Sequence, residues 1–185
     1  MTALLRNPIV SSSARAPVAR APVARAPVAH ASVGNTSIYR ATKTYDHAEG
    51  LSCCFRQWRA VSSHCRLLHG YALAFHLVFA TDRLDDRNWC FDFGGLKPVR
   101  SWLHEMFDHT VLVAADDPER CEFERLAARG LVDLRILPAV GCEAVAQHVF
   151  DHVAAYVMEQ TNGRVWLEAV EVREHSGNGA SYQVQ

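Results

Sequence analysis

The chain has 185 residues, of which 49% are hydrophobic, so it is long enough for one domain with a buried core. The formal net charge of −1 conceals an uneven distribution, because residues 1–45 carry six basic side chains and no acidic one, which leaves −7 for the remainder. This acidic remainder argues against a broad basic face for nucleic acid, and no apolar run reaches the ~18 residues needed to span a membrane.

The first part of the chain contains a short repeat, Ala-Pro-Val-Ala-Arg, which begins at Ala16 and recurs at Ala21 and, with a final histidine, at Ala26. Proline at every fifth position removes helical hydrogen-bond donors and disfavours the helical conformation of the residue before it. We therefore predict that residues 1–36 are a disordered extension and that residues 37–185 form the domain. An arginine-rich leader without acidic residues is also typical of an organelle presequence, and that alternative stays open.

Six cysteines are scattered along the chain without a Cys-x-x-Cys pair. The apolar stretch at residues 3–5 is too short for a secretory signal and ends at Arg6. We therefore expect reduced thiols and a cytosolic protein.

The hydrophobic pattern after the extension predicts strands and helices in alternation. The predicted elements are strands at 37–45, 51–58, 70–81 and 90–93, a helix at 96–107, a short helix from 116 to 130, a strand at 132–137, a helix at 143–160, and strands at 164–174 and 180–184. Pro98 suits the first turn of the first helix. The order β-β-α-(α)-β-α-β-β predicts an α+β domain in which an antiparallel sheet carries helices on one face.

The turn before the third predicted strand holds the first candidate site residue, Cys65. His64, Arg66 and His69 are its neighbours in sequence, and cationic neighbours favour the reactive thiolate. The alternative is a small buried apolar side chain. That is the role we expect of the other cysteines, which are Cys53, Cys54, Cys90, Cys121 and Cys142.

His69 and Tyr71 are two residues apart at the start of a predicted strand, so their side chains point to the same face. Two imidazoles at this spacing would begin a zinc site, whereas tyrosine is an uncommon zinc ligand. His69 is therefore the candidate metal ligand, and His64 and Tyr71 are the candidates that would complete the site. The alternative for His69 is a histidine bonded to the backbone.

Two acidic positions are candidates for chemistry. Asp108 precedes His109 at the end of the first predicted helix, and a carboxylate beside an imidazole can fix its tautomer and raise its basicity. The alternative is a histidine that only interacts favourably with the end of the helix. Glu174 shares the inward parity of Val170 and Val172, where a carboxylate needs a partner. A ligand with paired N–H donors would supply one, and a salt bridge to an arginine is the alternative.

Taken together, these motifs resemble the 6-pyruvoyl-tetrahydropterin synthase family, above all its bacterial branch, the 6-carboxy-tetrahydropterin synthases of the queuosine (7-deazaguanine) pathway. The resemblance covers about residues 50–184. The matching segments are, in chain order, Cys65-Arg66-Leu67-Leu68-His69-Gly70, Asp92-Phe93-Gly94-Gly95-Leu96-Lys97, Asp108-His109, Glu143, Arg173-Glu174 and Tyr182.

This resemblance implies the tunnelling fold, in which subunits join their sheets into a barrel and form active sites at their interfaces. It also implies a lyase that converts 7,8-dihydroneopterin triphosphate or a close pterin. The implied catalytic residues are Cys65, Asp108 and His109, and the implied substrate-binding residues are Glu174 and Glu143.

The resemblance further implies zinc held by three histidines. Only His69 matches, because Phe55 and Tyr71 stand at the other two positions. A non-catalytic pterin-binding or structural paralogue that has lost the zinc site is therefore the alternative to the lyase.

Overall fold

The computed structural model describes residues 37–184, and the predicted extension over residues 1–36 lies outside this part. The elements in chain order are β1 (Tyr39–Tyr45), the 3-10 turn η1 (His47–Glu49), β2 (Ser52–Phe55), η2 (His64–Arg66), β3 (His69–Ala72), β4 (Ala74–Thr81), η3 (Phe93–Leu96), α1 (Lys97–Phe107), β5 (Thr110–Ala114), α2 (Arg120–Ala128), β6 (Asp133–Leu137), α3 (Cys142–Gln160), β7 (Trp166–His175) and β8 (Asn178–Gln183).

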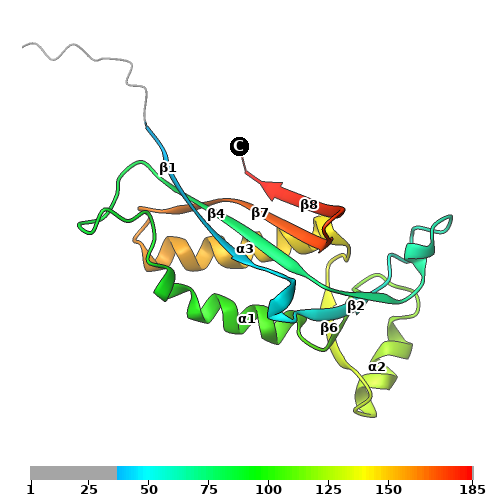
Figure 1. The fold of residues 1–185 in the computed structure, drawn as a ribbon. Helices are drawn as coiled ribbons and strands as arrows, with labels where there is room; N and C mark the ends of the chain where they lie inside the picture. The colour runs from blue at the N-terminus through cyan, green and yellow to red at the C-terminus, as the bar shows by residue number, and fades with distance from the viewer. Residues whose placement is uncertain (1–36, 185) are drawn as a thin grey trace, which may run out of the picture. The chain divides into compact units, whose positions relative to one another are not determined.

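The described strands form two four-stranded sheets. The first has the order β1-β4-β7-β8 and is antiparallel throughout, and α1 and α3 cover one of its faces (Figure 1). The second has the order β3-β2-β5-β6, in which β3 runs antiparallel to β2 while β2, β5 and β6 run parallel. The prediction of an α+β domain with helices on one face of an antiparallel sheet is confirmed.

The second sheet contains a strand, β5, that sequence analysis missed. All of its residues are buried, and it pairs in parallel with a strand on each side. A strand of this kind shows no alternation between apolar and polar residues, so its sequence lacks the usual signal. Two other predictions need correction. The predicted strand at 70–81 is divided at Leu73 into β3 and β4, which belong to different sheets, and residues 90–92 lead into η3 without forming a strand.

The helices bury the apolar stripes that the sequence predicts. Pro98 lies in the first turn of α1, where its missing N–H group costs nothing. The Phe107 ring at the end of α1 packs 5.0 Å from the Phe75 ring of β4. Along α3 the fully buried stripe consists of Val145, Val149, Val153 and Val157. This packing fixes α1 and α3 against the first sheet and places the residues that follow α1 at the start of β5, an inner strand of the second sheet.

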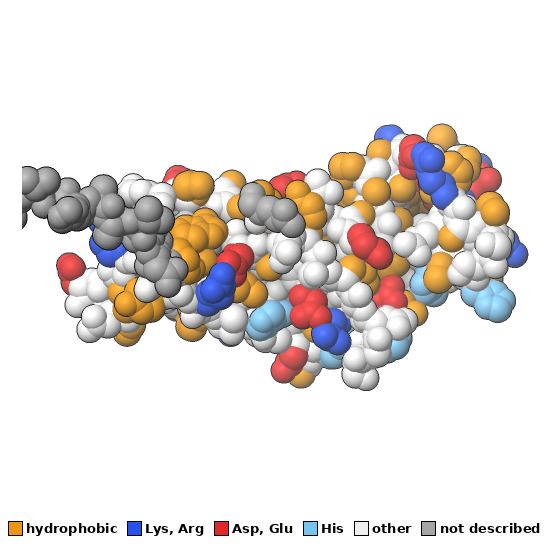
Figure 2. Space-filling model, turned by 90° about the horizontal axis from the view of Figure 1, so that it is seen from above, with side chains coloured by type: hydrophobic (Ala, Val, Ile, Leu, Met, Phe, Trp, Pro, Cys, Tyr) orange, Lys and Arg blue, Asp and Glu red, His pale blue; other side chains and the backbone are white. Residues whose placement is uncertain are grey.

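No helix in residues 37–184 has the length and apolar character needed to cross a membrane. On the face shown in Figure 2, acidic and basic side chains lie beside each other and do not gather into a patch of one sign. On the first sheet, for example, Arg40 pairs with Glu168 through two hydrogen bonds, each with an N–O distance of 2.6 Å.

Candidate active site

Three rings meet on one face of β2 and β3. The centroid of the His69 ring lies 5.5 Å from that of Phe55 and 5.5 Å from that of Tyr71. The His175 ring, at the end of β7, lies 6.1 Å from the Tyr71 ring. We name these four side chains the aromatic cluster. The predicted same-face arrangement of His69 and Tyr71 is confirmed, whereas His175 was missed because only the fold brings β7 to β3.

Gly70 permits this arrangement. A Cβ atom at this position would lie 2.8 Å from the carbonyl oxygen of Cys53 and 3.1 Å from the Cβ of Cys54. Any side chain here would therefore push β3 away from β2. Glycine is needed because the two backbones approach closely at this point.

The rings on either side of His69 lie at spacings close to those of a zinc site, but they are not zinc ligands. Three imidazoles on one tetrahedral zinc, with Zn–N bonds of about 2.0–2.1 Å, have ring centroids about 5 Å apart. Phe55 and Tyr71 each lie close to that distance from His69, whose Nδ1–H group donates to the Leu67 carbonyl at 2.7 Å and leaves Nε2 free. A phenyl ring offers no ligand atom, however. Within residues 37–184, no group of three His, Cys, Asp or Glu side chains is placed to hold a metal ion. His64, which is exposed, therefore does not complete such a group in this part of the chain. The residues do not fit the three-histidine zinc set.

Two carboxylates and two thiols lie next to the aromatic cluster. The charge of Glu174 is the main cause that raises the pKa of the Tyr71 hydroxyl, and burial and the charges of Cys65 and Cys142 add to it. Cys142, the first residue of α3, is close enough to Glu174 for the carboxylate charge to act on its thiol. Burial first, and then the charges of Glu174 and Glu143, raise the pKa of Cys142 to about 12. Both predicted substrate-binding carboxylates therefore lie near the first turn of α3.

A second group of polar side chains joins η1, α1 and the start of β5. We name it the histidine–carboxylate network, and it consists of Glu49, Arg100, His104, Asp108 and His109. His109 Nδ1–H donates to Asp108 Oδ1 at 2.5 Å, and His104 Nδ1–H donates to Asp108 Oδ2 at 3.2 Å. Glu49 lies 3.5 Å from His104 Nε2 and accepts a 2.8 Å bond from Arg100. The bonds from His109 and His104 hold the pKa of Asp108 below its usual range.

The His109 backbone adopts an unusual conformation. Its φ of 58° is left-handed, which is uncommon for a residue other than glycine, although histidine is among those that tolerate it. Its N–H group donates to the Ser52 carbonyl at 2.7 Å, which fixes it to the start of β2. The side chain is 89% exposed. The predicted Asp108–His109 pair is therefore formed, and its imidazole Nε2 is accessible.

Cys65 and His109 lie at opposite ends of β2. His109 bonds to Ser52 at the start of the strand, whereas the Cys65 carbonyl accepts a 2.8 Å bond from the N–H group of Gln57, just past its end. The five residue-to-residue steps from Ser52 to Gln57 span about 16 Å when extended. One chain therefore does not bring the predicted catalytic residues together.

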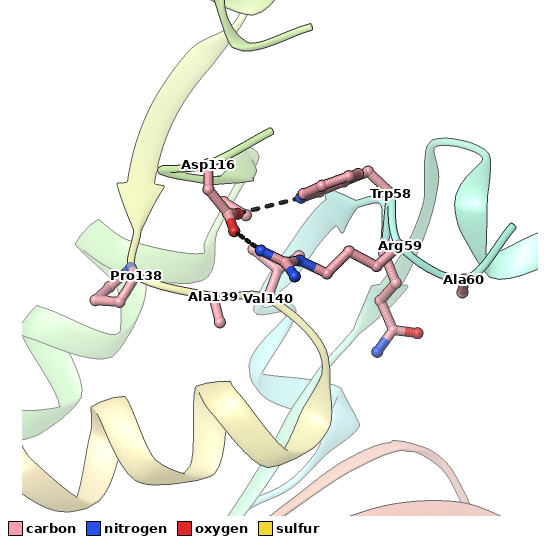
Figure 3. A pocket seen from close by; sticks show the side chains of 9 residues that line it. Trp58, Arg59, Ala60, Asp116, Pro138, Ala139 and Val140 are labelled. Carbon is pink, nitrogen blue, oxygen red and sulfur yellow. Dashed lines mark hydrogen bonds and ion pairs between the residues drawn. The ribbon is translucent and has the colours of Figure 1, made fainter. Parts of the chain in front are cut away.

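A pocket of about 540 Å³ lies beyond the carboxyl ends of the parallel strands (Figure 3). Trp58 Nε1–H donates to Asp116 Oδ1 at 3.1 Å, and Arg59 pairs with the same carboxylate. Residues 138–140 form another part of the wall, and Gln57 connects the pocket to the candidate cysteine. None of the predicted site residues lines it. Sequence analysis missed the pocket because its walls meet only through the parallel pairing of β2 with β5 and β6.

The remaining cysteines differ in burial. Cys53, Cys90 and Cys142 are buried as predicted, and burial raises the pKa of Cys53 to about 12. Cys54 is only half-buried, and Cys121 is exposed on α2, so the expectation of buried side chains is wrong for these two. Neither lies in the aromatic cluster or in the histidine–carboxylate network.

Comparison with known proteins identifies relatives in sequence and in fold. The sequence profile of a family described as 6-pyruvoyl tetrahydropterin synthase matches residues 43–185. An uncharacterized protein from Wolinella succinogenes has a similar fold, with a TM-score of 0.68 at 18% identity, covering 80% of this chain and 99% of that one. The Plasmodium vivax 6-pyruvoyl tetrahydropterin synthase gives 0.58 at 15% identity, with 79% and 97% covered. The Caenorhabditis elegans enzyme gives 0.51 at 16%, with 80% and 96% covered. No curated protein matches the sequence.

Proposed function

Because the chain belongs to the 6-pyruvoyl tetrahydropterin synthase family, we propose that it is a lyase of pterin metabolism that converts 7,8-dihydroneopterin triphosphate, as the 6-carboxy-tetrahydropterin synthases do. The observation that carries this proposal is the meeting of β7 with β3, where the Tyr71 ring lies 6.1 Å from the His175 ring, next to Glu174 in sequence, and the charges of Glu174 and Cys65 both raise the pKa of Tyr71. A half-buried carboxylate beside a thiol and a phenol provides an anchor for a polar heterocycle and a base next to it.

In this proposal Glu174 anchors the substrate. The pterin 2-amino group and a ring N–H donate to its two oxygens, which gives a charge-assisted bidentate contact. Glu143 contributes from the first turn of α3, near the same edge of the ring. The Cys65 thiolate then removes a proton from the side-chain carbon of the pterin.

The second acid–base group is His109, oriented by Asp108. Since it lies at the far end of β2 from Cys65, we propose that it reaches the substrate from a second copy of the chain. β1 and β8 are the outer strands of the first sheet, and open edges of this kind are usually paired. A closed homo-oligomer would pair these edges and bring His109 of one copy to Cys65 of another.

Charge that develops on the substrate side chain needs stabilisation, which zinc would supply in a three-histidine site. Here we assign that role to the Tyr71 hydroxyl and to the Arg66 guanidinium, both of which can donate to a developing oxyanion. The raised pKa of Tyr71 keeps its hydroxyl protonated and therefore able to donate.

Turnover of purified protein with 7,8-dihydroneopterin triphosphate tests the proposal. We expect Cys65→Ala to keep pterin affinity and to lower kcat by roughly 10²–10⁴, the usual worth of a positioned proton-transfer group. We expect Glu174→Ala to weaken binding by about 2–5 kcal/mol, the cost of losing a charged partner. Cys121→Ala, which removes an exposed thiol on α2, is the matched control and should change neither value.

The alternative is a non-catalytic pterin-binding protein. The presence of Phe55 and Tyr71 at two of the three zinc positions favours it, because the lost ligands remove the Lewis acid. Pterin binding without turnover, in the presence or absence of added zinc, would support this alternative. Absence of pterin binding would contradict both functions.

A further inference from the structure

Asp108 bonds to two imidazoles, one on each oxygen. His109 Nδ1–H occupies Oδ1 and His104 Nδ1–H occupies Oδ2. The second bond follows from helical geometry, because His104 lies four residues before Asp108 in the last turn of α1. The backbone N–H group of Asp108 also donates to the His104 carbonyl at 2.9 Å. Backbone and side chain of Asp108 are thus both tied to the same residue.

His104 is itself held from its other side. Its Nε2 atom lies 3.5 Å from the Glu49 carboxylate of η1, which Arg100 binds at 2.8 Å. The side chains of His104, Asp108 and Glu49 are 31%, 33% and 22% exposed, so water reaches the network only in part. His109, at 89%, is the exposed end of this chain of contacts. Exposure therefore increases along the network, from the Glu49 carboxylate to the accessible His109 imidazole.

A carboxylate held through both oxygens cannot rotate freely about its Cβ–Cγ bond. Fixing Oδ2 by His104 therefore keeps Oδ1 directed at His109 Nδ1. An imidazole that donates from Nδ1 carries its lone pair on Nε2, which is the atom able to take a proton from a substrate. The lowered pKa of Asp108, caused first by His109 and then by His104, is consistent with this geometry.

We propose that His104 is a positioning residue, which fixes the Asp108 carboxylate so that His109 is held as its Nδ1–H tautomer with Nε2 free. Glu49 and Arg100 hold His104 in turn. The role of His109 in turnover rests on the proposed function, but the control of its tautomer by His104 does not.

Asparagine and glutamine separate this role from simple packing. The side-chain amide of His104→Asn places its donor near the position of Nδ1 and can still bind Asp108. His104→Gln places its donor near the position of Nε2, toward Glu49, and leaves Oδ2 of Asp108 without a partner. We expect kcat to fall roughly tenfold to 100-fold in His104→Gln and His104→Ala, with KM unchanged, because the base is misoriented. His104→Asn should keep most of the wild-type kcat.

The tautomer itself is read by ¹⁵N NMR of the His109 ring in the oligomeric protein without substrate. We expect the Nδ1–H form to predominate in wild type and in His104→Asn, and a mixture of tautomers in His104→Gln and His104→Ala. His76→Gln is the matched control, since His76 bonds to Thr44 on the first sheet and does not contact the network. Thermal unfolding establishes that each variant is folded.

An unchanged His109 tautomer in folded His104→Gln would overturn the proposal, as would equal loss in His104→Asn and His104→Gln. If wild type proves to have no turnover, the lyase function fails, and the NMR comparison alone decides the role of His104.

Discussion

The aromatic cluster and the histidine–carboxylate network lie at opposite ends of the same strand, β2, and differ in what holds them. The aromatic cluster is held by ring packing and by the close approach of β3 to β2 at Gly70. The network is held by hydrogen bonds to carboxylates, in which His104 and His109 occupy both oxygens of Asp108. One region is fixed by the packing of rings and the other by hydrogen bonds.

This difference determines how each region responds to substitution. Swaps between side chains of similar volume are tolerated best in a packed region, so one ring can replace another there at small cost. A bonded carboxylate depends on its donors, since an unpaired charged group costs far more than a poorer contact. Substitutions between rings are therefore expected to be tolerated better in the aromatic cluster than loss of a donor is in the network.

Mixed oligomers give the strongest test of the separation between the two regions. Cys65→Ala and His109→Asn should each lower kcat by roughly 10²–10⁴. Asparagine is used because it tolerates the left-handed backbone of His109. If the site combines Cys65 of one copy with His109 of another, unfolding and refolding the two variants together should restore part of the activity. No recovery from properly assembled mixtures would place both groups in a site formed by one chain.

Tyr71→Phe tests whether the aromatic cluster supplies chemistry as well as shape. The rings keep their packing in this variant, and only the hydroxyl is lost. We expect kcat to fall by roughly 10², the worth of one oxyanion donor, with pterin affinity preserved. The matched control is Tyr182→Phe on β8, which also removes one tyrosine hydroxyl. Equal kcat in wild type and Tyr71→Phe would limit the aromatic cluster to binding.

Restoring the missing ligands tests whether the metal-site geometry persists. We expect the wild type to bind little zinc and the double variant Phe55→His with Tyr71→His to bind about one zinc per chain, because His69 would then have an imidazole on each side at 5.5 Å, close to the spacing that zinc needs. Elemental analysis after gel filtration measures the ratio. Adding His69→Ala to the double variant should abolish binding. Stoichiometric zinc in the wild type that persists in His64→Ala would contradict our assignment of the ligands.

The smallest expected effect is a change in the free energy of unfolding with pH. The pH at which stability is lost separates the contribution of the histidines on α3 from that of the network. Burial lowers the pKa values of His148 and His152 on α3. The contribution of these two neutral side chains to the free energy of unfolding is therefore complete above pH 6.5. It is lost as the pH falls below 6.5, because the unfolded chain then binds protons more readily than the folded one. The pKa of Asp108 is also lowered, and its contribution is complete above pH 3.8 and lost as the pH falls further. Urea unfolding should show both losses, the first reduced in His148→Gln and the second in Asp108→Asn.

Much of the first sheet could be predicted because its strands and helices have one buried and one exposed face. The parity of Glu174 with Val170 and Val172 on β7 follows from such alternation, and the structure buries both valines and half of Glu174. The second sheet was harder to predict. β5 is buried throughout, and parallel pairing leaves no hairpin signal in the sequence.

Within the candidate site, local pairs were predictable and distant ones were not. Asp108 and His109 are adjacent in sequence, and His69 and Tyr71 are related by strand parity. His104 was classified only as a helix residue, although its spacing of four from Asp108 is a contact signal in any helix. His175 joins the aromatic cluster through the packing of β7 against β3, which no local pattern records.

Gly70 also bears on how such a site changes over evolution. Because no side chain fits between β3 and β2 here, the backbone that carries positions 55, 69 and 71 is fixed independently of the side chains placed on it. Mutations at positions 55 and 71 can then accumulate one at a time without any shift of the scaffold. A change in metal binding would in that case need side-chain changes alone, and this chain is two substitutions, at positions 55 and 71, away from a three-histidine set.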